Sequence, residues 1–208
     1  MTPSDELLHS TVQIVCEQAS GGVSFGTGFF FGFFPQGNQN VPVIATNKHL
    51  VAGANTGHFR LSMRKDDGSV DLNNFVDSTV PNFSNQWIPH PDPSVDLTVM
   101  PCGGLLRELD AQGRKPFFVT LDPTLVPTDA ELAELTPLEE ILVVGYPNGI
   151  IDKAHNIPVF RRGITATPAY IDFNNTKEFL IDASIFPGSS GSPVFCLIRG
   201  PMQLVEDL

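Results

Sequence analysis

The sequence is poor in positive charge, in cysteine and in long apolar runs, and each shortage excludes a class of protein. It has 12 Lys and Arg against 23 Asp and Glu, so the formal net charge is −11 and a nucleic-acid partner is not expected. Its three cysteines, Cys16, Cys102 and Cys196, form no CxxC pair. That pattern argues against a disulfide framework and against a zinc site, and we expect reduced, buried thiols. The densest apolar run, residues 29–34, is far too short to cross a bilayer.

The remaining composition is that of a folded protein. Residues 1–10 have no apolar run that would resemble a signal peptide, so we expect a cytoplasmic protein with no membrane partner. Hydrophobic residues make up 41% of the 208 positions and charged residues 17%, which predicts a substantial core and argues against disorder. Eighteen glycines and eighteen prolines spread along the chain predict many short elements separated by turns.

Short β-strands are predicted over most of the first hundred residues. In residues 11–17, Val12, Ile14 and Cys16 alternate with polar residues, so they should share one face of a strand. Residues 23–34 combine phenylalanine with glycine, which suggests a strand that bends sharply or lets another backbone approach. Further strands are expected at residues 41–46, 58–64, 70–76 and 85–88.

The pattern changes after residue 102. Between residues 103 and 140 the segments are leucine-rich and acidic, and residues 129–135 predict a helix with Thr128 as its N-cap. Strands are expected again at residues 141–144, 159–167, 178–183 and 193–198. The sequence therefore predicts one mostly-β domain over residues 1–208, with two lobes at 1–102 and 141–208 and short helices in the connection at 103–140.

Three motifs carry the residue types that acyl transfer to a serine requires: a base, a carboxylate that orients it, and N–H donors for the oxyanion. Ser190 lies in the run PGSSGSP, in which the glycines permit a tight turn that would aim the amides of Gly188 and Ser190 at an oxyanion. His49 follows an apolar strand in ATNKHLV, and Asp96 begins another in SVDLTVM. Each motif alone also fits an ordinary turn, surface histidine or strand cap, but all three together in this order are much rarer.

The neighbouring candidates are better explained as structural. His58 begins a strand, while His90 and Asp92 belong to a proline-rich loop. Ser189 and Ser192 flank the nucleophile position. No histidine follows Ser190, which excludes an α/β-hydrolase built on this serine. A metal-dependent hydrolase is disfavoured because no HExxH spacing exists.

With these motifs, and with GTGF at residues 26–29 and GYP at 145–147, the chain resembles the chymotrypsin-fold (trypsin-like) serine peptidases, especially their compact bacterial members. The resemblance implies two antiparallel six-stranded barrels, one in residues 1–102 and the other in 141–208. It also implies endopeptidase activity on proteins or peptides without a cofactor or metal. By this likeness His49 is the general base and then the general acid, Asp96 orients it, and Ser190 is the nucleophile that forms an acyl-enzyme.

The sequence departs from the family pattern in ways that bear on regulation and specificity. Ser189 stands where activated zymogens carry an aspartate, so we expect regulation by other means, such as an activating partner. Ser184, six residues before Ser190, lies by resemblance at the base of the substrate pocket and favours a neutral or apolar P1 residue. Only 18 residues follow Ser190, with strands available at 193–198 and 202–205. The second barrel is therefore expected to be abbreviated, truncated or completed by another chain.

The short segment after Ser190 and the acidic composition support an alternative of a different class. A catalytically weak or inactive trypsin-like fold would act as a peptide- or protein-binding module, because an exposed strand can bind an extended peptide without cleaving it.

Overall fold

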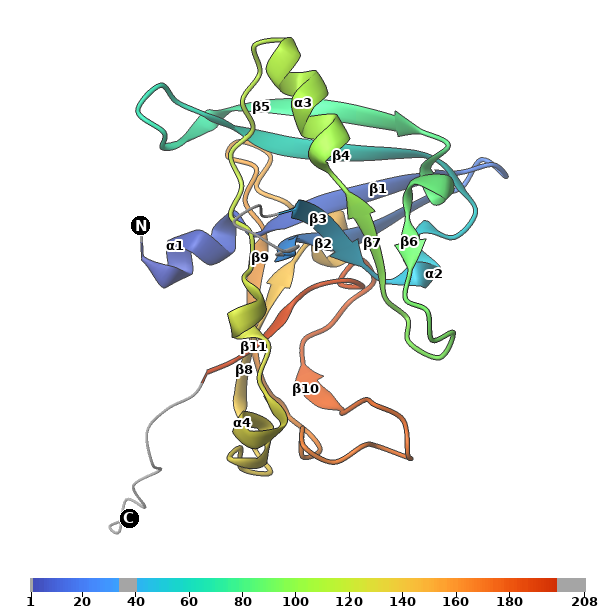
Figure 1. The fold of residues 1–208 in the computed structure, drawn as a ribbon, viewed down its shortest axis with the longest axis vertical. Coiled ribbons are helices and arrows are strands. Elements are labelled where there is room, and N and C mark those ends of the chain that lie inside the picture. Colours follow the sequence, from blue (N-terminus) through green and yellow to red (C-terminus); the bar gives the residue numbers. More distant parts are fainter. Residues whose placement is uncertain (1, 34–40, 198–208) are drawn as a thin grey trace. The chain divides into compact units, whose positions relative to one another are not determined.

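The computed structural model describes residues 2–33 and 41–197, and the chain clusters into two compact units (Figure 1). The first unit comprises Met1–Val126, Val144–Phe160 and Ile185–Pro193, and the second comprises Pro127–Val143, Arg161–Ser184 and Val194–Leu208. The chain therefore passes repeatedly between the units, and segments distant in sequence meet within each of them.

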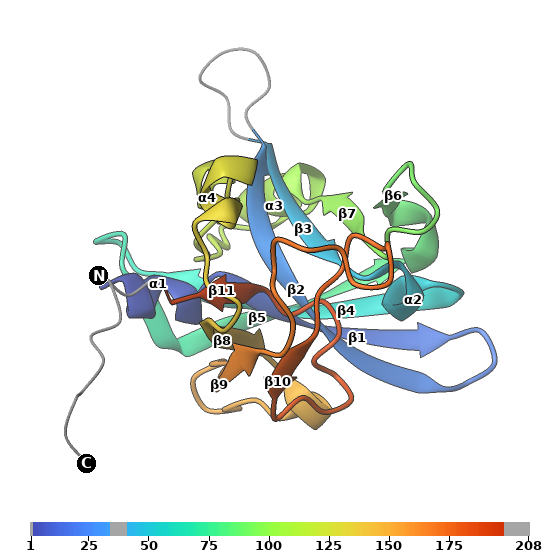
Figure 2. The same ribbon diagram turned by 90° about the horizontal axis from the view of Figure 1, so that it is seen from below.

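The first unit contains an antiparallel sheet of seven strands within the described residues. Its spatial order is β5-β4-β1-β2-β3-β7-β6, and Figure 2 shows β2 and β3 running side by side. The strands are β1 (Thr11–Gln18), β2 (Val23–Phe33), β3 (Val41–Thr46), β4 (Ala54–Arg64), β5 (Val70–Pro81), β6 (Ile88–Pro89) and β7 (Thr98–Pro101). The mostly-β prediction is confirmed, but this sheet has seven strands instead of six and its outer strands, β5 and β6, do not pair to close it.

The core of the first unit lies on the alternating faces of these strands. Val12, Ile14 and Cys16 are 1%, 0% and 0% exposed, which confirms the face predicted from their spacing. Phe83 lies between Phe59 and Trp87, with ring centroids 5.6 Å and 5.4 Å away. Burial of each such side chain contributes roughly 1.5–3 kcal/mol, so this core fixes the strands that carry the candidate site.

The glycines of β2 give room to neighbouring side chains. A Cβ atom at Gly26 would lie 2.1 Å from the side chain of Leu50, and one at Gly28 would lie 2.7 Å from that of Ile44. The predicted close approach is therefore present. The nearest atoms at both glycines belong to apolar side chains, and the backbone oxygen of Ala45 would lie 3.4 Å from a Cβ at Gly28.

The second sheet is smaller. Its four described strands follow the order β10-β9-β8-β11, and the pairs β9/β10 and β8/β11 are antiparallel. They are β8 (Glu140–Gly145), β9 (Val159–Thr165), β10 (Ile181–Ala183) and β11 (Val194–Cys196). Four is fewer than the six that the resemblance implies, and the candidate strand at residues 202–205 lies outside the described residues.

The helices are short. They are α1 (Pro3–Leu8), α2 (Lys48–Val51), α3 (Gly103–Ala111) and α4 (Asp129–Ala133), together with the 3₁₀ turns η1 (Phe83–Gln86), η2 (Pro123–Leu125) and η3 (Pro147–Gly149). The helix predicted after Thr128 is confirmed as α4, where Thr128 and Glu131 form a capping box. The strand predicted at residues 85–88 is wrong at its start, because Asn85 and Gln86 belong to η1.

Two further observations concern the helices and the cysteines. None of the described helices has both the length and the apolar character needed to span a membrane. All three cysteines are unpaired thiols, and Cys16 and Cys102 are buried as expected. Cys196 is exposed, contrary to the expectation of buried thiols, because it lies on the short strand β11 with its side chain outside the core.

Candidate active site

The three residues of the predicted triad lie next to one another in the structure. Asp96 Oδ2 is 2.5 Å from His49 Nδ1, and His49 Nε2 is 3.2 Å from Ser190 Oγ. Both distances are within hydrogen-bonding range. All three residues belong to the first unit. The two ring nitrogens of one imidazole therefore connect a carboxylate on one side to a hydroxyl on the other.

Local structure holds His49 in this orientation. The residue lies in the single turn of α2, directly after β3, and its backbone N–H donates to Asp96 Oδ1 at 3.1 Å. The carboxylate thus binds both the ring and the backbone of the same histidine. This bidentate contact restricts rotation of the imidazole about its side-chain bonds.

The loop before β7 is attached to the same turn. Asn47 Nδ2 donates to the carbonyl of Asp96 at 2.7 Å, and Lys48 Nζ donates to the carbonyl of Asp92 at 2.9 Å. Residues on both sides of the α2 start therefore fix the backbone that presents the carboxylate.

The charge on Asp96 follows from these contacts. Partial burial raises the pKa of this carboxyl, but hydrogen bonds from the ring and backbone of His49 lower it by more, so the pKa lies below its ordinary value. Asp96 is accordingly ionised at neutral pH. The His49 and Asp96 side chains are 59% and 45% exposed, so this pair contributes little to folding stability.

The loop that carries Ser190 is shaped by two glycines with left-handed backbones. Gly188 has φ +90° and Gly191 has φ +83°, a region that L-residues with a Cβ atom rarely adopt. A Cβ at Gly191 would also lie 2.1 Å from the carbonyl oxygen of Thr27. The local geometry therefore requires glycine at positions 188 and 191.

The peptides before Gly188 and Ser190 are held by their carbonyl groups. The carbonyl of Pro187 accepts from the amide of Asn148, and that of Ser189 accepts from the amide of Ser192 at 2.9 Å. In a trans peptide the N–H points opposite to the C=O, so both contacts turn the following N–H away from these partners. No hydrogen bond within the described residues uses the Gly188 or Ser190 amide as its donor.

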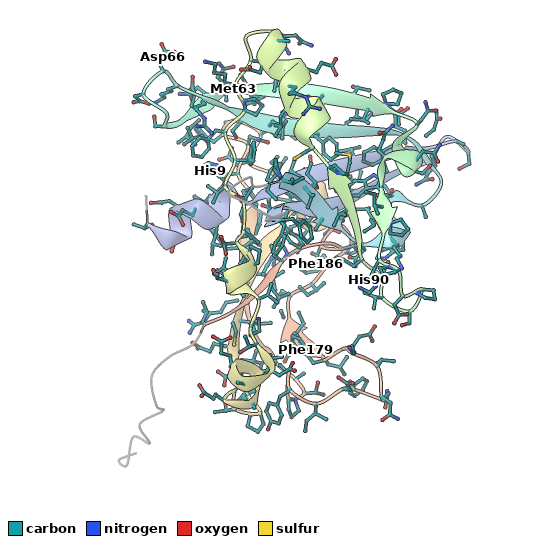
Figure 3. All side chains as sticks on the ribbon, viewed as in Figure 1. His9, Met63, Asp66, His90, Phe179 and Phe186 are labelled. Carbon is teal, nitrogen blue, oxygen red and sulfur yellow. The ribbon has the colours of Figure 1, made fainter. Side chains whose placement is uncertain are left out.

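The other histidine candidates have separate partners. His58 Nδ1 lies 3.1 Å from Thr79 Oγ1, and its Nε2 lies 3.2 Å from Glu17. His90 Nδ1 accepts from the amide of Asp92 in the loop after β6 (Figure 3). These partners lie outside the triad, in agreement with the structural interpretation of both histidines.

The remaining serine and aspartate candidates are also occupied with local structure or enclosed. Asp92 accepts from the amide and hydroxyl of Ser94. Ser189 is 9% exposed. The hydroxyl of Ser192 is buried without a hydrogen-bond partner among the described residues, and it lies where a Cβ at Gly145 would come within 2.0 Å of it. Of the three serines in this run, Ser190 is the one whose hydroxyl faces His49.

Ser184 belongs to the second unit. It lines an open hollow of about 460 Å³, together with Arg162, Asp182 and other residues of the small sheet. Within this hollow Arg162 pairs with Glu140. The assignment of Ser184 to a substrate pocket stays a prediction.

Thr27 and Thr46 are two residues of the site that sequence reasoning did not single out. Both are 0% exposed, and Thr27 binds the backbone of Gly188 and Ser190. The available signal was the position of Thr27 between the two glycines of GTGF, but the motif does not reveal which loop the threonine contacts.

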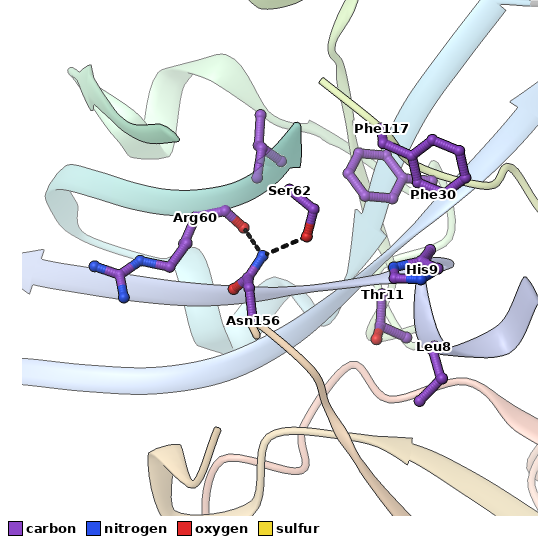
Figure 4. A pocket seen from close by; sticks show the side chains of 9 residues that line it. Leu8, His9, Thr11, Phe30, Arg60, Ser62, Phe117 and Asn156 are labelled. Carbon is purple, nitrogen blue, oxygen red and sulfur yellow. Dashed lines mark hydrogen bonds between the residues drawn. The ribbon is translucent and has the colours of Figure 1, made fainter. Parts of the chain in front are cut away.

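The first unit also contains a small cavity that is not lined by any of the triad residues. It measures about 10 Å³ and is lined in part by His9, Thr11 and Asn156 (Figure 4). Asn156 donates from Nδ2 to the carbonyl of Arg60 and to Ser62 Oγ, each at 3.1 Å. Within residues 2–33 and 41–197, no group of three or more His, Cys, Asp or Glu side chains is arranged to hold a metal ion.

Comparison with known proteins gives a family and a set of similar folds. The trypsin-like peptidase domain family matches residues 26–200, whereas the comparison with curated proteins gives no match. Among solved structures, the HtrA-type protease AlgW with a tripeptide is 18% identical, with a TM-score of 0.50 over 91% of this chain and 48% of that chain. The active form of the Rv3671c protease from M. tuberculosis is 20% identical, with a TM-score of 0.45 over 92% and 67%.

The extent of these matches defines what they support. The chain spans about half the length of the AlgW chain, and at this identity the likeness concerns the fold alone. The family match covers most of the chain. It runs from β2 past the end of β11 and includes the segments of His49, Asp96 and Ser190. The chain belongs to the family of trypsin-like peptidase domains.

Proposed function

We propose that this protein is a serine endopeptidase that cleaves proteins or peptides through an acyl-enzyme. The observation that carries the proposal is the continuous relay from Asp96 through His49 to Ser190, with distances of 2.5 Å and 3.2 Å. A nucleophile, a base and an orienting carboxylate in this sequence of contacts form the arrangement that acyl transfer requires.

The first half of the reaction follows from the hydrogen bonds. With Nδ1–H donated to Asp96, the imidazole tautomer leaves Nε2 as an acceptor for the Ser190 hydroxyl. Ser190 Oγ attacks the scissile carbonyl carbon while its proton moves to Nε2. His49 then donates that proton to the leaving amine, the C–N bond breaks, and Ser190 keeps the acyl group as an ester.

The second half repeats these steps with water. Water loses a proton to His49 Nε2 and attacks the ester carbonyl, and the proton returns to Ser190 Oγ as the acid product leaves. Asp96 stays ionised throughout, since its lowered pKa suits a group that stabilises the imidazolium without taking its proton.

The amides of Gly188 and Ser190 are the proposed oxyanion donors. The carbonyls of the same two peptides accept hydrogen bonds from the amides of Asn148 and Ser192. This supports N–H groups that point in the opposite direction, away from Asn148 and Ser192. Donors fixed before the reaction stabilise the developing negative charge without a reorganisation cost.

The proposed mechanism also bears on cofactors, partners and specificity. The proposed steps use only side chains and backbone amides, so they need no cofactor. The net charge of −11 argues against nucleic acid as a partner. We further propose, from the resemblance, that Ser184 favours a neutral or apolar P1 residue.

Labelling with a fluorophosphonate probe tests the proposal. The folded protein should become labelled at Ser190, Ser190→Ala should abolish labelling, and His49→Ala should slow it by on the order of 10⁴-fold, because triad members act as a unit. Mass spectrometry of the labelled peptide identifies the site. Absence of labelling in well-folded protein, with a peptide that binds but stays intact, would instead support the binding-module alternative.

A further inference from the structure

Thr27 makes four hydrogen bonds that together join the segments carrying the triad. Its N–H donates to the carbonyl of Ser190 at 2.9 Å, and its hydroxyl donates to the carbonyl of Gly188 at 3.1 Å. The hydroxyl also accepts from the amide of Tyr146 at 3.0 Å, and its carbonyl accepts from Thr46 Oγ1 at 2.7 Å. Every polar atom of this residue therefore has a partner.

These partners belong to two segments of the triad. Gly188 and Ser190 lie in the loop of the proposed nucleophile, whereas Thr46 ends β3 two residues before α2 begins at Lys48. A single side chain and its own peptide groups thus tie the serine loop to the strand that leads to His49.

The attachment is rigid because it is buried. Thr27 and Thr46 are both 0% exposed and Tyr146 is 1% exposed. Tyr146 is itself anchored to β1, since its phenol donates to the carbonyl of Thr11 at 3.4 Å. Water therefore cannot reach Thr27 to replace a hydrogen bond that is lost there.

We propose that Thr27 is a positioning residue that sets the Ser190 loop against His49, an inference that rests on the proposed peptidase function. Without its hydroxyl, the Gly188 carbonyl and the Tyr146 amide would both remain buried and unpaired. The loop would relieve this by shifting, and the shift would move Ser190 Oγ relative to His49 Nε2. A displacement of about 1 Å at a reacting atom can slow a reaction by about 100-fold.

Thr165 provides a matched control in the second unit. It is 2% exposed, and its hydroxyl donates to the carbonyl of Pro137 at 3.3 Å and accepts from the amide of Glu139 at 2.8 Å. Thr165→Val therefore removes a buried hydroxyl with the same pattern of partners as Thr27→Val, but at the end of β9, which carries no triad residue.

The experiment compares the full chain with Thr27→Val, Thr27→Ser and Thr165→Val. Fluorophosphonate labelling rates should fall by about 100-fold in Thr27→Val and stay within about 5-fold of the unmodified protein in Thr27→Ser, which keeps the hydroxyl. Thr165→Val should label within about 2-fold of the unmodified protein, because the partners of its hydroxyl, Pro137 and Glu139, belong to no triad segment. Hydrogen–deuterium exchange across residues 186–192 should accelerate in Thr27→Val only.

The outcomes separate this inference from the proposed function. Normal labelling and exchange in Thr27→Val, or equal slowing in Thr165→Val, would overturn the role of Thr27 while leaving the peptidase proposal intact. If the unmodified protein is not labelled but exchange accelerates in Thr27→Val, the loop is positioned by Thr27 and the peptidase proposal fails. Should Thr27→Val not fold, Thr46→Val must slow labelling, since it removes a single hydrogen bond of the same group.

Discussion

At the scale of single residues, Gly191 is poorly able to accept a side chain. Its φ of +83° is strained for any residue with a Cβ atom, and that atom would lie 2.1 Å from Thr27 O and 2.2 Å from Thr46 Oγ1. We predict that Gly191→Ala destabilises the protein by about 2–4 kcal/mol and slows fluorophosphonate labelling by at least about 100-fold. Urea unfolding and labelling of the folded fraction measure the two effects.

Gly21 separates the cost of the backbone from the cost of the contact. It has φ +90°, but a Cβ atom added there would meet no other atom within 4 Å, so Gly21→Ala carries only the conformational penalty, about 1 kcal/mol. Labelling should stay at the unmodified rate. Equal behaviour of the two alanine variants would show that packing against Thr27 does not matter.

Residue chemistry also explains which parts of the candidate site were predictable. Acyl transfer restricts the triad to a few residue types, so His49, Asp96 and Ser190 could be chosen from motifs alone. The role of Thr27 could not, because its partner Gly188 is 161 positions away and nothing in the GTGF motif specifies a hydrogen bond across that distance.

At the scale of elements, the turn α2 and the loop before β7 act together through Asn47. Its side-chain amide donates to the Asp96 carbonyl at 2.7 Å. We predict that Asn47→Ala slows labelling by about 10-fold, because the carboxylate then loses part of its backbone support. The comparison is Asn74→Ala, since Asn74 is an exposed residue of β5. A labelling rate for Asn47→Ala equal to that of Asn74→Ala would contradict the prediction.

Elements with a clear sequence pattern were predicted well, whereas a very short helix and a segment set by tertiary contacts were not. The strand at residues 41–46 was predicted with the observed ends of β3, because its apolar run is bounded by turn residues. The helix α1 was missed, since six residues give too short a pattern and its capping box joins only Thr2 and Asp5. Residues 85–86 form part of η1, where burial of Phe83 and Trp87 decides the conformation.

At the scale of the whole molecule, the number of strands in each sheet depends on pairings between distant segments. The periodicity of a strand shows which face is buried but not which neighbour it joins. β7 pairs with β3 although α2, β4, β5, η1 and β6 intervene. The mostly-β class and the two sheets were therefore predictable, whereas the seven and four described strands were not.

The stability of the whole molecule should depend on pH through His9. This residue is 7% exposed, its ring packs edge-on against Phe117 with centroids 5.2 Å apart, and it lines the small cavity of Figure 4. Burial lowers the pKa of His9 below 6.5, and the nearby charge of Asp5 opposes this only in part. The native imidazole therefore stays neutral at pH values where the unfolded one becomes protonated.

The direction of the effect follows from proton binding. As the pH falls below 6.5, the unfolded state binds a proton that the native state does not, so the free energy of unfolding decreases until the lowered native pKa is reached. We predict a loss of up to about 1.4 kcal/mol per pH unit from this group, measured by urea unfolding at about pH 7.5, 6.5 and 5.5. His9→Gln should reduce that dependence, because the unfolded variant gains no proton at this position. An equal pH dependence of the free energy of unfolding in the two proteins would show that His9 does not couple folding to pH.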